Sequence, residues 1–162
     1  MSYSIRDCYN EHGLDFYKNI PYTNPHFVDI KFLVESNLNH IRGTVLDMCC
    51  GNGEITSILK NNCIGVDPYL YEKYKSNTGN YCLPYSFKDM IEKGLPKVDT
   101  IICSYAIHLC CKSMLPMLLY SLSQSSDNLI IISPSDSLEI KHYWKLKNHV
   151  KHNRTHWRQY EH

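Results

Sequence analysis

The segment 44–56, TVLDMCCGNGEIT, constrains the fold of this chain most strongly. Strand-forming residues lead to a carboxylate, Asp47, and Gly51 and Gly53 then form a turn without side-chain bulk. A helical pattern of apolar residues begins at Glu54. A strand–turn–helix of this kind lets a ligand approach bare backbone and the positive end of a helix.

A second expected strand, CIGVD, ends in Asp67, whose carboxylate can accept hydrogen bonds from ribose hydroxyls. A dinucleotide-binding turn usually has a third glycine three residues after the second, but Thr56 stands at that position here. A methyl donor carries no phosphate and needs only the first two glycines. These features favour a methyl donor, and a plain strand–turn–helix without a ligand is the alternative.

On these residues the chain resembles the class I S-adenosylmethionine (SAM)-dependent methyltransferases. The first motif of that family is an acidic residue, two further residues, and Cys-Gly-x-Gly or a close variant. Residues 47–53, DMCCGNG, fit this motif, with Cys49 where many members carry glycine. The pieces YTNPH, GVDPYLYEKY, ICSYAIHL and an ISP turn followed by a tryptophan are similar to a compact, poorly characterised subgroup. The resemblance implies SAM as cofactor and leaves the acceptor open.

The rest of the chain alternates expected strands and helices. Nearly continuous apolar strands alternating with helices predict a parallel sheet covered on both faces. We expect an α/β fold, a three-layer Rossmann-like sheet that is mostly parallel with an antiparallel C-terminal strand or hairpin. Its domain would span 1–162, with a donor-binding core at 43–134. The expected strands are 44–48, 63–67, 81–85, 98–104 and 128–134, and the expected helices are 54–59, 70–75 and 114–122.

The resemblance also implies which residues hold the donor. The segment 86–90 would hold the adenine ring through Phe87 and Asp89, although Asp89 could equally be a helix N-terminal carboxylate or a solvated loop charge. Asp47 would suit the amino group of the bound amino-acid portion. The predicted cofactor contacts are Asp47, Cys49, Gly51, Gly53, Asp67, Pro68, Phe87, Asp89 and Cys103.

Residues 1–40 are expected to form a helical cover over the donor. Asn24 is a predicted helix cap with Pro25 at the first helical position. The apolar residues that would pack this helix on the sheet are Phe27, Ile30, Phe32, Leu33 and Leu38.

The resemblance places the segment before the first strand over the transferred methyl group. It implies that Tyr17, Tyr22 and His26 line the acceptor pocket, with His108 facing it from the other side. A histidine near its unperturbed pKa could accept a proton from an oxygen or nitrogen acceptor. The predicted catalytic residues are therefore His108, Tyr22 and His26, and a hydrogen-bonded histidine at a helix start is the alternative for His108.

Basic residues concentrate in 141–162, which holds six Lys and Arg against one Glu and has a net charge of +5. The preceding 140 residues keep eleven Lys and Arg against fifteen Asp and Glu, giving −4. The favoured interpretation is a basic edge hairpin that turns near His152, since lysine discourages sheet-to-sheet aggregation. A nucleic-acid surface is the second interpretation. Metal binding by His149, His152 and His156 on a helix is the third, and no metal site is predicted.

Composition places the chain among ordinary globular proteins. It has 162 residues, near the usual size for one core, and 43% apolar residues. Most of its eight cysteines fall in expected strands or adjacent pairs, which indicates reduced thiols and a cytoplasmic protein. No signal peptide or membrane span is expected. The sequence contains no CxxC motif, so a structural zinc site of the usual type is not expected.

These patterns predict methyl transfer from SAM to a small-molecule O or N acceptor. The alternatives are an RNA-directed methyltransferase that uses 141–162, and a non-catalytic donor-binding or partner module of the same fold. The intact Asp47, Gly51, Gly53 and Asp67 favour an active enzyme over a module. The net acidic body disfavours a polyanionic acceptor. The oligomeric state does not follow from the sequence.

Overall fold

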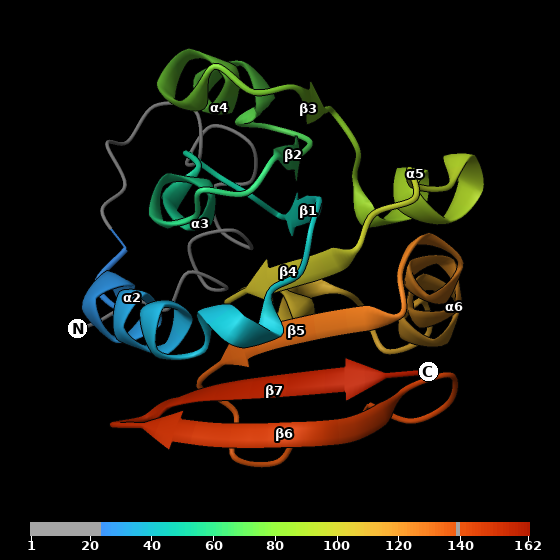
Figure 1. The fold of residues 1–162 in the computed structure, drawn as a ribbon. Helices are drawn as coiled ribbons and strands as arrows, with labels where there is room; N and C mark the ends of the chain where they lie inside the picture. The colour runs from blue at the N-terminus through green and yellow to red at the C-terminus, as the bar shows by residue number, and fades with distance from the viewer. Residues whose placement is uncertain (1–23, 139) are drawn as a thin grey trace, which may run out of the picture.

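A seven-stranded sheet organises the computed structural model, which describes residues 24–138 and 140–162 (Figure 1). The strand order is β3-β2-β1-β4-β5-β7-β6. The pairs among β1 to β5 are parallel, while β7 runs antiparallel to both β5 and β6. The α/β fold with an antiparallel C-terminal hairpin is thereby confirmed. The strands are β1 (Val45–Met48), β2 (Cys63–Val66), β3 (Cys82–Leu83), β4 (Thr100–Ser104), β5 (Asn128–Ser133), β6 (Lys145–His152) and β7 (Thr155–Glu161).

Helices cover both faces of the sheet and make three layers (Figure 1). One face carries α2, α3 and α4, and the other carries α5 and α6. The helices are α2 (Phe27–Ser36), α3 (Glu54–Ile58), α4 (Tyr71–Thr78), α5 (Phe87–Lys93) and α6 (Leu115–Ser125), with two 3₁₀ turns, η1 (Leu38–His40) and η2 (Ile107–Leu109).

The central strands are apolar at successive positions because successive side chains point to opposite, equally covered faces. Val45 and Ile102 pack under α2 and α3, whereas Leu46 and Ile101 pack under α5 and α6. All four side chains are completely buried. Continuous apolar runs therefore build two cores, one on each side of the sheet.

The N-terminal helix differs from its prediction in both its start and its buried face. It begins at Phe27, and Asn24 makes a turn before it by accepting a hydrogen bond from the His26 amide at 2.9 Å. Helical periodicity from Ile30 brings Val34 into the core together with Leu33. Two of the residues predicted to pack on the sheet, Phe32 and Leu38, are instead half exposed.

The predicted basic hairpin is confirmed, with its turn at 153–154 and β6 at the edge of the sheet. Lys145, Lys147 and Lys151 are exposed on this edge strand. By contrast β7 is buried at every position from Thr155 to Tyr160, because it lies inside the sheet with both faces covered. Arg158 is therefore buried and donates to the Ser135 carbonyl oxygen at 2.7 Å.

The three histidines considered for a metal do not converge. His149 Nε2 lies 2.7 Å from His156 Nδ1, and the other ring nitrogen of His156 lies 2.8 Å from Asp136. His152 instead stacks on Phe32 with ring centroids 3.9 Å apart. These histidines belong to strands and not to the helix that alignment on one metal would require. Within 24–138 and 140–162, no group of three or more His, Cys, Asp or Glu side chains is arranged to hold a metal ion.

Candidate functional site

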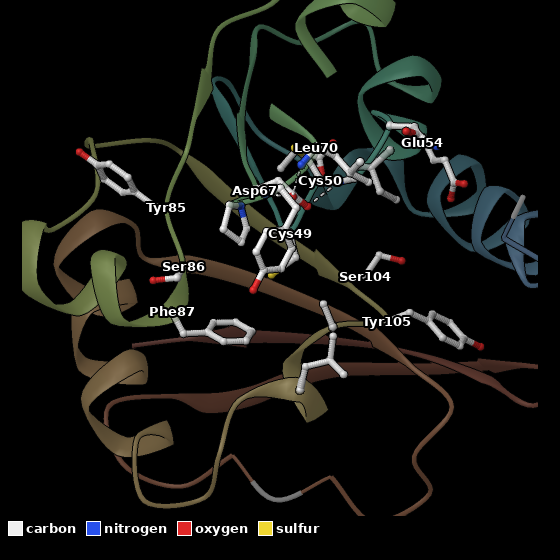
Figure 2. A pocket seen from close by; sticks show the side chains of 18 of the residues that line it. Cys49, Cys50, Glu54, Asp67, Leu70, Tyr85, Ser86, Phe87, Ser104 and Tyr105 are labelled. Atoms are coloured by element: carbon white, nitrogen blue, oxygen red, sulfur yellow. Dashed lines mark hydrogen bonds between the residues drawn. The ribbon is translucent and has the colours of Figure 1, made fainter. Parts of the chain in front are cut away.

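A pocket opens where the carboxyl ends of β1, β2 and β4 meet (Figure 2). From β1 the chain adds β2 and β3 on one side of the sheet and β4 and β5 on the other, so this is the topological switch point where ligands bind in open α/β sheets. The residues that line this pocket include Asn24, Asp47, Cys49, Gly51, Asn52, Glu54, Asp67, Pro68, Tyr85, Ser86, Phe87, Met90, Ser104, Tyr105 and Leu109.

The glycine turn after β1 presents one of its two glycines to the pocket. Gly51 has a left-handed φ of +53°, and a Cβ built there would meet only Leu70 Cδ1, at 4.0 Å. Gly53 also has a positive φ, but its Cβ would lie 2.5 Å from Thr78 Cγ2, and Gly53 is outside the lining. Gly51 thus leaves space for a ligand, whereas Gly53 allows the start of α3 to pack against α4.

Asp67 ties this turn to the connection between β2 and α4. Its Oδ2 accepts the Gly51 amide at 3.1 Å, and its Oδ1 accepts the Tyr69 and Leu70 amides at 2.8 Å each. A carboxylate offers about four acceptor positions, so Asp67 keeps acceptor capacity toward the pocket that it lines.

Asp47 lies at the floor of the pocket and is 2% exposed. Its Oδ2 accepts the Thr56 hydroxyl at 2.8 Å and the Thr56 amide at 3.2 Å. Thr56 stands where a dinucleotide-binding turn usually has its third glycine, and here its hydroxyl stabilises the Asp47 carboxylate. Desolvation raises the pKa of Asp47 from 3.8 to about 7, and the charges of Asp67 and Glu54 add to the effect.

The raised pKa of Asp47 predicts how the stability of the ligand-free protein depends on pH. The stabilising contribution of a protonated Asp47 is fully present below pH 3.8 and is lost as pH rises through about 7. Relative to Asp47→Asn, the wild type should lose on the order of 3 kcal/mol of unfolding free energy between pH 5 and pH 8. Urea unfolding of both proteins at the two pH values measures this difference. Parallel pH profiles for the two proteins would contradict it.

Two buried polar atoms in the pocket wall have no hydrogen-bond partner among residues 24–138 and 140–162. They are Asn52 Oδ1, in the glycine turn, and Ser104 Oγ, at the end of β4. Nearly all buried polar groups in proteins are hydrogen-bonded, so these two atoms fit a polar ligand that supplies the missing bonds. Neither residue was predicted as a site residue from the sequence, although each stands at the carboxyl end of a strand or in the turn that follows one.

Tyr105 forms a wall at one end of the pocket and holds a left-handed φ of +53°. Its hydroxyl lies 2.7 Å from Thr155 Oγ1, and the His26 ring stacks on its own ring with centroids 4.6 Å apart. Left-handed conformations of bulky residues occur mainly at functional sites. His26 thus touches the pocket wall, although it is not itself a lining residue.

His108, the other predicted catalytic histidine, does not line the pocket. His108 is exposed on η2 and outside the lining, although its neighbour Leu109 is part of it. Tyr17 and Tyr22 lie outside the described residues. The predicted convergence of His26 and His108 on one pocket is thus not seen within the described lining.

Of the two residues predicted to hold the adenine ring, Phe87 lines the pocket and Asp89 does not. Phe87 points into the pocket (Figure 2), beside the lining residues Ser86 and Met90. Asp89 instead forms a capping box at the start of α5, accepting the Ser86 amide at 3.0 Å while its own amide donates to Ser86 Oγ at 3.2 Å. The segment 86–90 is thus a helix start, and Asp89 stabilises that helix outside the lining.

The remaining predicted contacts divide in the same way. Pro68 and Cys49 line the pocket, while Cys103 is buried behind it in β4. A hydrogen bond with Cys103 and burial both hold the pKa of Cys49 well above its usual range. All seven cysteines within the described residues are free thiols.

Solved structures of low sequence identity share this architecture. Magnesium protoporphyrin IX methyltransferase (ChlM) from Synechocystis PCC 6803 with bound SAH superposes with a TM-score of 0.66 at 12% identity, covering 97% of both chains. The chain has the class I methyltransferase fold. The putative methyltransferase yhhF from Escherichia coli gives a TM-score of 0.62 at 15% identity, covering 88% of this chain and 89% of that one.

An RNA-modifying enzyme shares the class I methyltransferase fold as well. The 16S rRNA methylase RmtB superposes with a TM-score of 0.64 at 9% identity, over 96% of this chain and 71% of that one. No protein-family model and no curated protein sequence matches the chain. Within the described part of this class I fold, none of the helices combines the length and apolar character needed to span a membrane.

Proposed function

We propose that the chain binds SAM in the switch-point pocket and transfers its methyl group to the oxygen or nitrogen of a small molecule. The observation that carries the proposal is the joint placement of Gly51 and Asp67. The bare backbone of Gly51 opens on the pocket and is hydrogen-bonded to the Asp67 carboxylate, which ends the neighbouring strand. Solved structures with the same fold include one with bound SAM and one with bound SAH.

Different lining residues would bind the ribose, the amino-acid portion and the adenine ring of the donor, according to their chemistry. Asp67 would accept hydrogen bonds from the ribose hydroxyls. The Oδ1 atom of Asn52, unpaired within the described residues, and the open backbone at Gly51 would hold the amino-acid portion. The apolar side chains of Phe87, Met90 and Leu109 would enclose the adenine ring.

Methyl transfer requires mainly that the donor and the acceptor are held in the right position. When bound, the donor supplies an activated methyl group with a sulfur leaving group already in place. The protein must then hold the acceptor beside it and keep water out, and such positioning alone accounts for a large part of a rate enhancement. The buried ends of β1 and β4 provide rigid walls for this purpose.

Calorimetric titration of SAM and S-adenosylhomocysteine (SAH), the donor without its methyl group, tests the proposal. Both should bind at one site, with dissociation constants in the micromolar range. An absence of heat for both ligands at millimolar concentration would reject the donor assignment. Donor binding without methyl transfer to any acceptor from an extract of metabolites and RNA would instead favour the non-catalytic module.

An RNA acceptor is the second candidate, because the edge strand β6 is rich in lysine and one solved structure of the same fold is an rRNA methylase. The contacts of the basic residues argue against it. Lys147 pairs with Glu161 at 3.9 Å, Lys151 pairs with Asp136 at 3.5 Å, and Arg158 is buried. The cations that the sequence concentrates in this segment are thus partly neutralised or inaccessible to phosphates.

We therefore predict no measurable RNA or DNA affinity at physiological salt. An electrophoretic gel-shift assay at increasing salt measures it, with a variant in which Lys145, Lys147, Lys151 and Arg154 are replaced by serine for comparison. An RNA-binding edge would show micromolar, salt-sensitive binding whose log–log salt slope falls by roughly 0.7 for each phosphate contact removed. That result would promote the RNA-directed alternative.

A further inference from the structure

The charges around the pocket are all of one sign. Asp47, Glu54 and Asp67 are the charged side chains among its lining residues, and no lysine, arginine or histidine joins them within the described residues. Asp47 and Asp67 are buried, and Glu54 is half buried. Unpaired carboxylates away from water are unfavourable, so this pocket favours ligands that bring positive charge.

The three carboxylates occupy different parts of the pocket. Figure 2 shows Tyr85 and Phe87 at one end, Glu54 and Tyr105 at the other, and Asp67 between them. Asp67 accepts three backbone amides, and its remaining acceptor capacity is assigned to the ribose hydroxyls, while Asp47 is held by Thr56. Glu54 is therefore the carboxylate available at the end opposite the aromatic residues.

Glu54 is poorly compensated at that end. The Asn24 side-chain amide donates to its Oε2 over 3.3 Å, and among the described residues Asn24 is the only hydrogen-bond partner of this carboxylate, through its side chain and its backbone. Burial raises the pKa of Glu54. Ser104, whose buried hydroxyl has no partner in the described part of the chain, lies on the same side of the pocket in Figure 2. An ammonium group is the ligand chemistry that satisfies both, because it carries positive charge and three N–H donors.

We propose that the end of the pocket formed by Asn24, Glu54 and Ser104 takes the acceptor and selects an amine-bearing small molecule, with Glu54 as the specificity-determining residue. This inference rests on the proposed donor site. Bound SAM adds one net positive charge, from a sulfonium and an ammonium against one carboxylate, to a site with up to three carboxylates. An acceptor with a carboxylate or phosphate would meet the remaining negative charge in a medium of low dielectric and be disfavoured.

Two donor analogues test the inference without knowledge of the acceptor. SAH has a neutral sulfur, whereas sinefungin has a carbon in place of the sulfur and carries a primary amine where the donor has its methyl group, so it presents an ammonium to the acceptor side. Calorimetry should show that the wild type binds sinefungin at least ten-fold more tightly than SAH. Glu54→Gln should reduce this preference to about two-fold or less and leave the SAH dissociation constant unchanged.

The variants are chosen to separate charge from shape. Glutamine keeps the size of Glu54 and can still accept from Asn24, and Glu54→Ser removes the charge in a second way should the first variant fail to fold. Glu92→Gln, on the exposed face of α5 and paired with Lys88, is the matched control and should behave as the wild type.

Other outcomes would overturn the inference. An unchanged sinefungin preference in Glu54→Gln would remove Glu54 from the acceptor side. An equal loss of affinity for SAH and sinefungin would place Glu54 in the donor site instead. If the wild type bound neither analogue, the proposed function itself would fail, which distinguishes that failure from a loss of the preference alone.

Discussion

Replacing Asp67 with alanine is expected to weaken SAM and SAH binding at least a hundred-fold. The variant loses the acceptor predicted for two ribose hydroxyls, and hydrogen bonds to charged groups contribute about 1.5–3 kcal/mol each. It also frees the amides of Gly51, Tyr69 and Leu70, which hold the turn in place. A loss of ~3 kcal/mol corresponds to roughly a hundred-fold in the dissociation constant, which calorimetry measures directly.

Asp89→Ala is the matched control for this variant, because it removes a carboxylate from the capping box of α5 and not from the pocket. It should lower the unfolding free energy in urea titrations, because it removes one half of the capping box, and leave donor affinity unchanged. If Asp67→Ala bound the donor as tightly as the wild type, the ribose assignment would be wrong. If Asp89→Ala lost donor binding, the adenine-loop role predicted for Asp89 would be restored.

Gly51→Val is expected to abolish donor binding in a protein that still folds. A side chain at Gly51 would meet little of the protein, since its Cβ would lie 4.0 Å from the nearest atom, Leu70 Cδ1. It would therefore project into the space where the backbone meets the ligand. The left-handed φ of +53° adds strain of roughly 1–2 kcal/mol for a residue with a Cβ. Calorimetry with SAH, together with a urea unfolding curve, measures both effects.

Gly79→Val is a control that separates the backbone strain of a positive φ from the blocking of the donor pocket by a side chain. Gly79 has a φ of +73° and nothing within 4 Å of a built Cβ, and it lies at the end of α4 away from the pocket lining. This variant should lose a similar unfolding free energy and keep its affinity for SAH. Gly53→Val is unsuitable as a control, because its Cβ would lie 2.5 Å from Thr78 Cγ2. A folded Gly51→Val protein with wild-type affinity would place the donor pocket elsewhere.

Predictions from local pattern failed where two structural roles share one sequence signal. An acidic residue three positions after a serine is typical both of a ligand-binding loop and of the first turn of a helix. Asp89 lies in the first turn of α5, in a capping box with Ser86. Both glycines of the turn have a positive φ, so the backbone alone does not distinguish them. The side chains packed around each one decide that Gly51 faces the pocket and Gly53 faces helix α4. Phe32 was expected in the core but lies outside the stripe set by Ile30, Leu33 and Val34.

The amino-acid sequence by itself determined the alternation of strands and helices except for α5, the parallel sheet, the glycine turn and the acidic ends of two strands. These features follow from local periodicity, backbone freedom and burial on both faces, which neighbouring residues specify. Only the tertiary structure decided that Thr56 supports Asp47 and that Asn24 reaches Glu54 across thirty positions. It also decided that Asn52 Oδ1 and Ser104 Oγ are buried without a partner in the part of the chain that the structure describes. Such contacts depend on which elements pack together, because desolvation and hydrogen bonding act between residues that are distant in sequence and close in space.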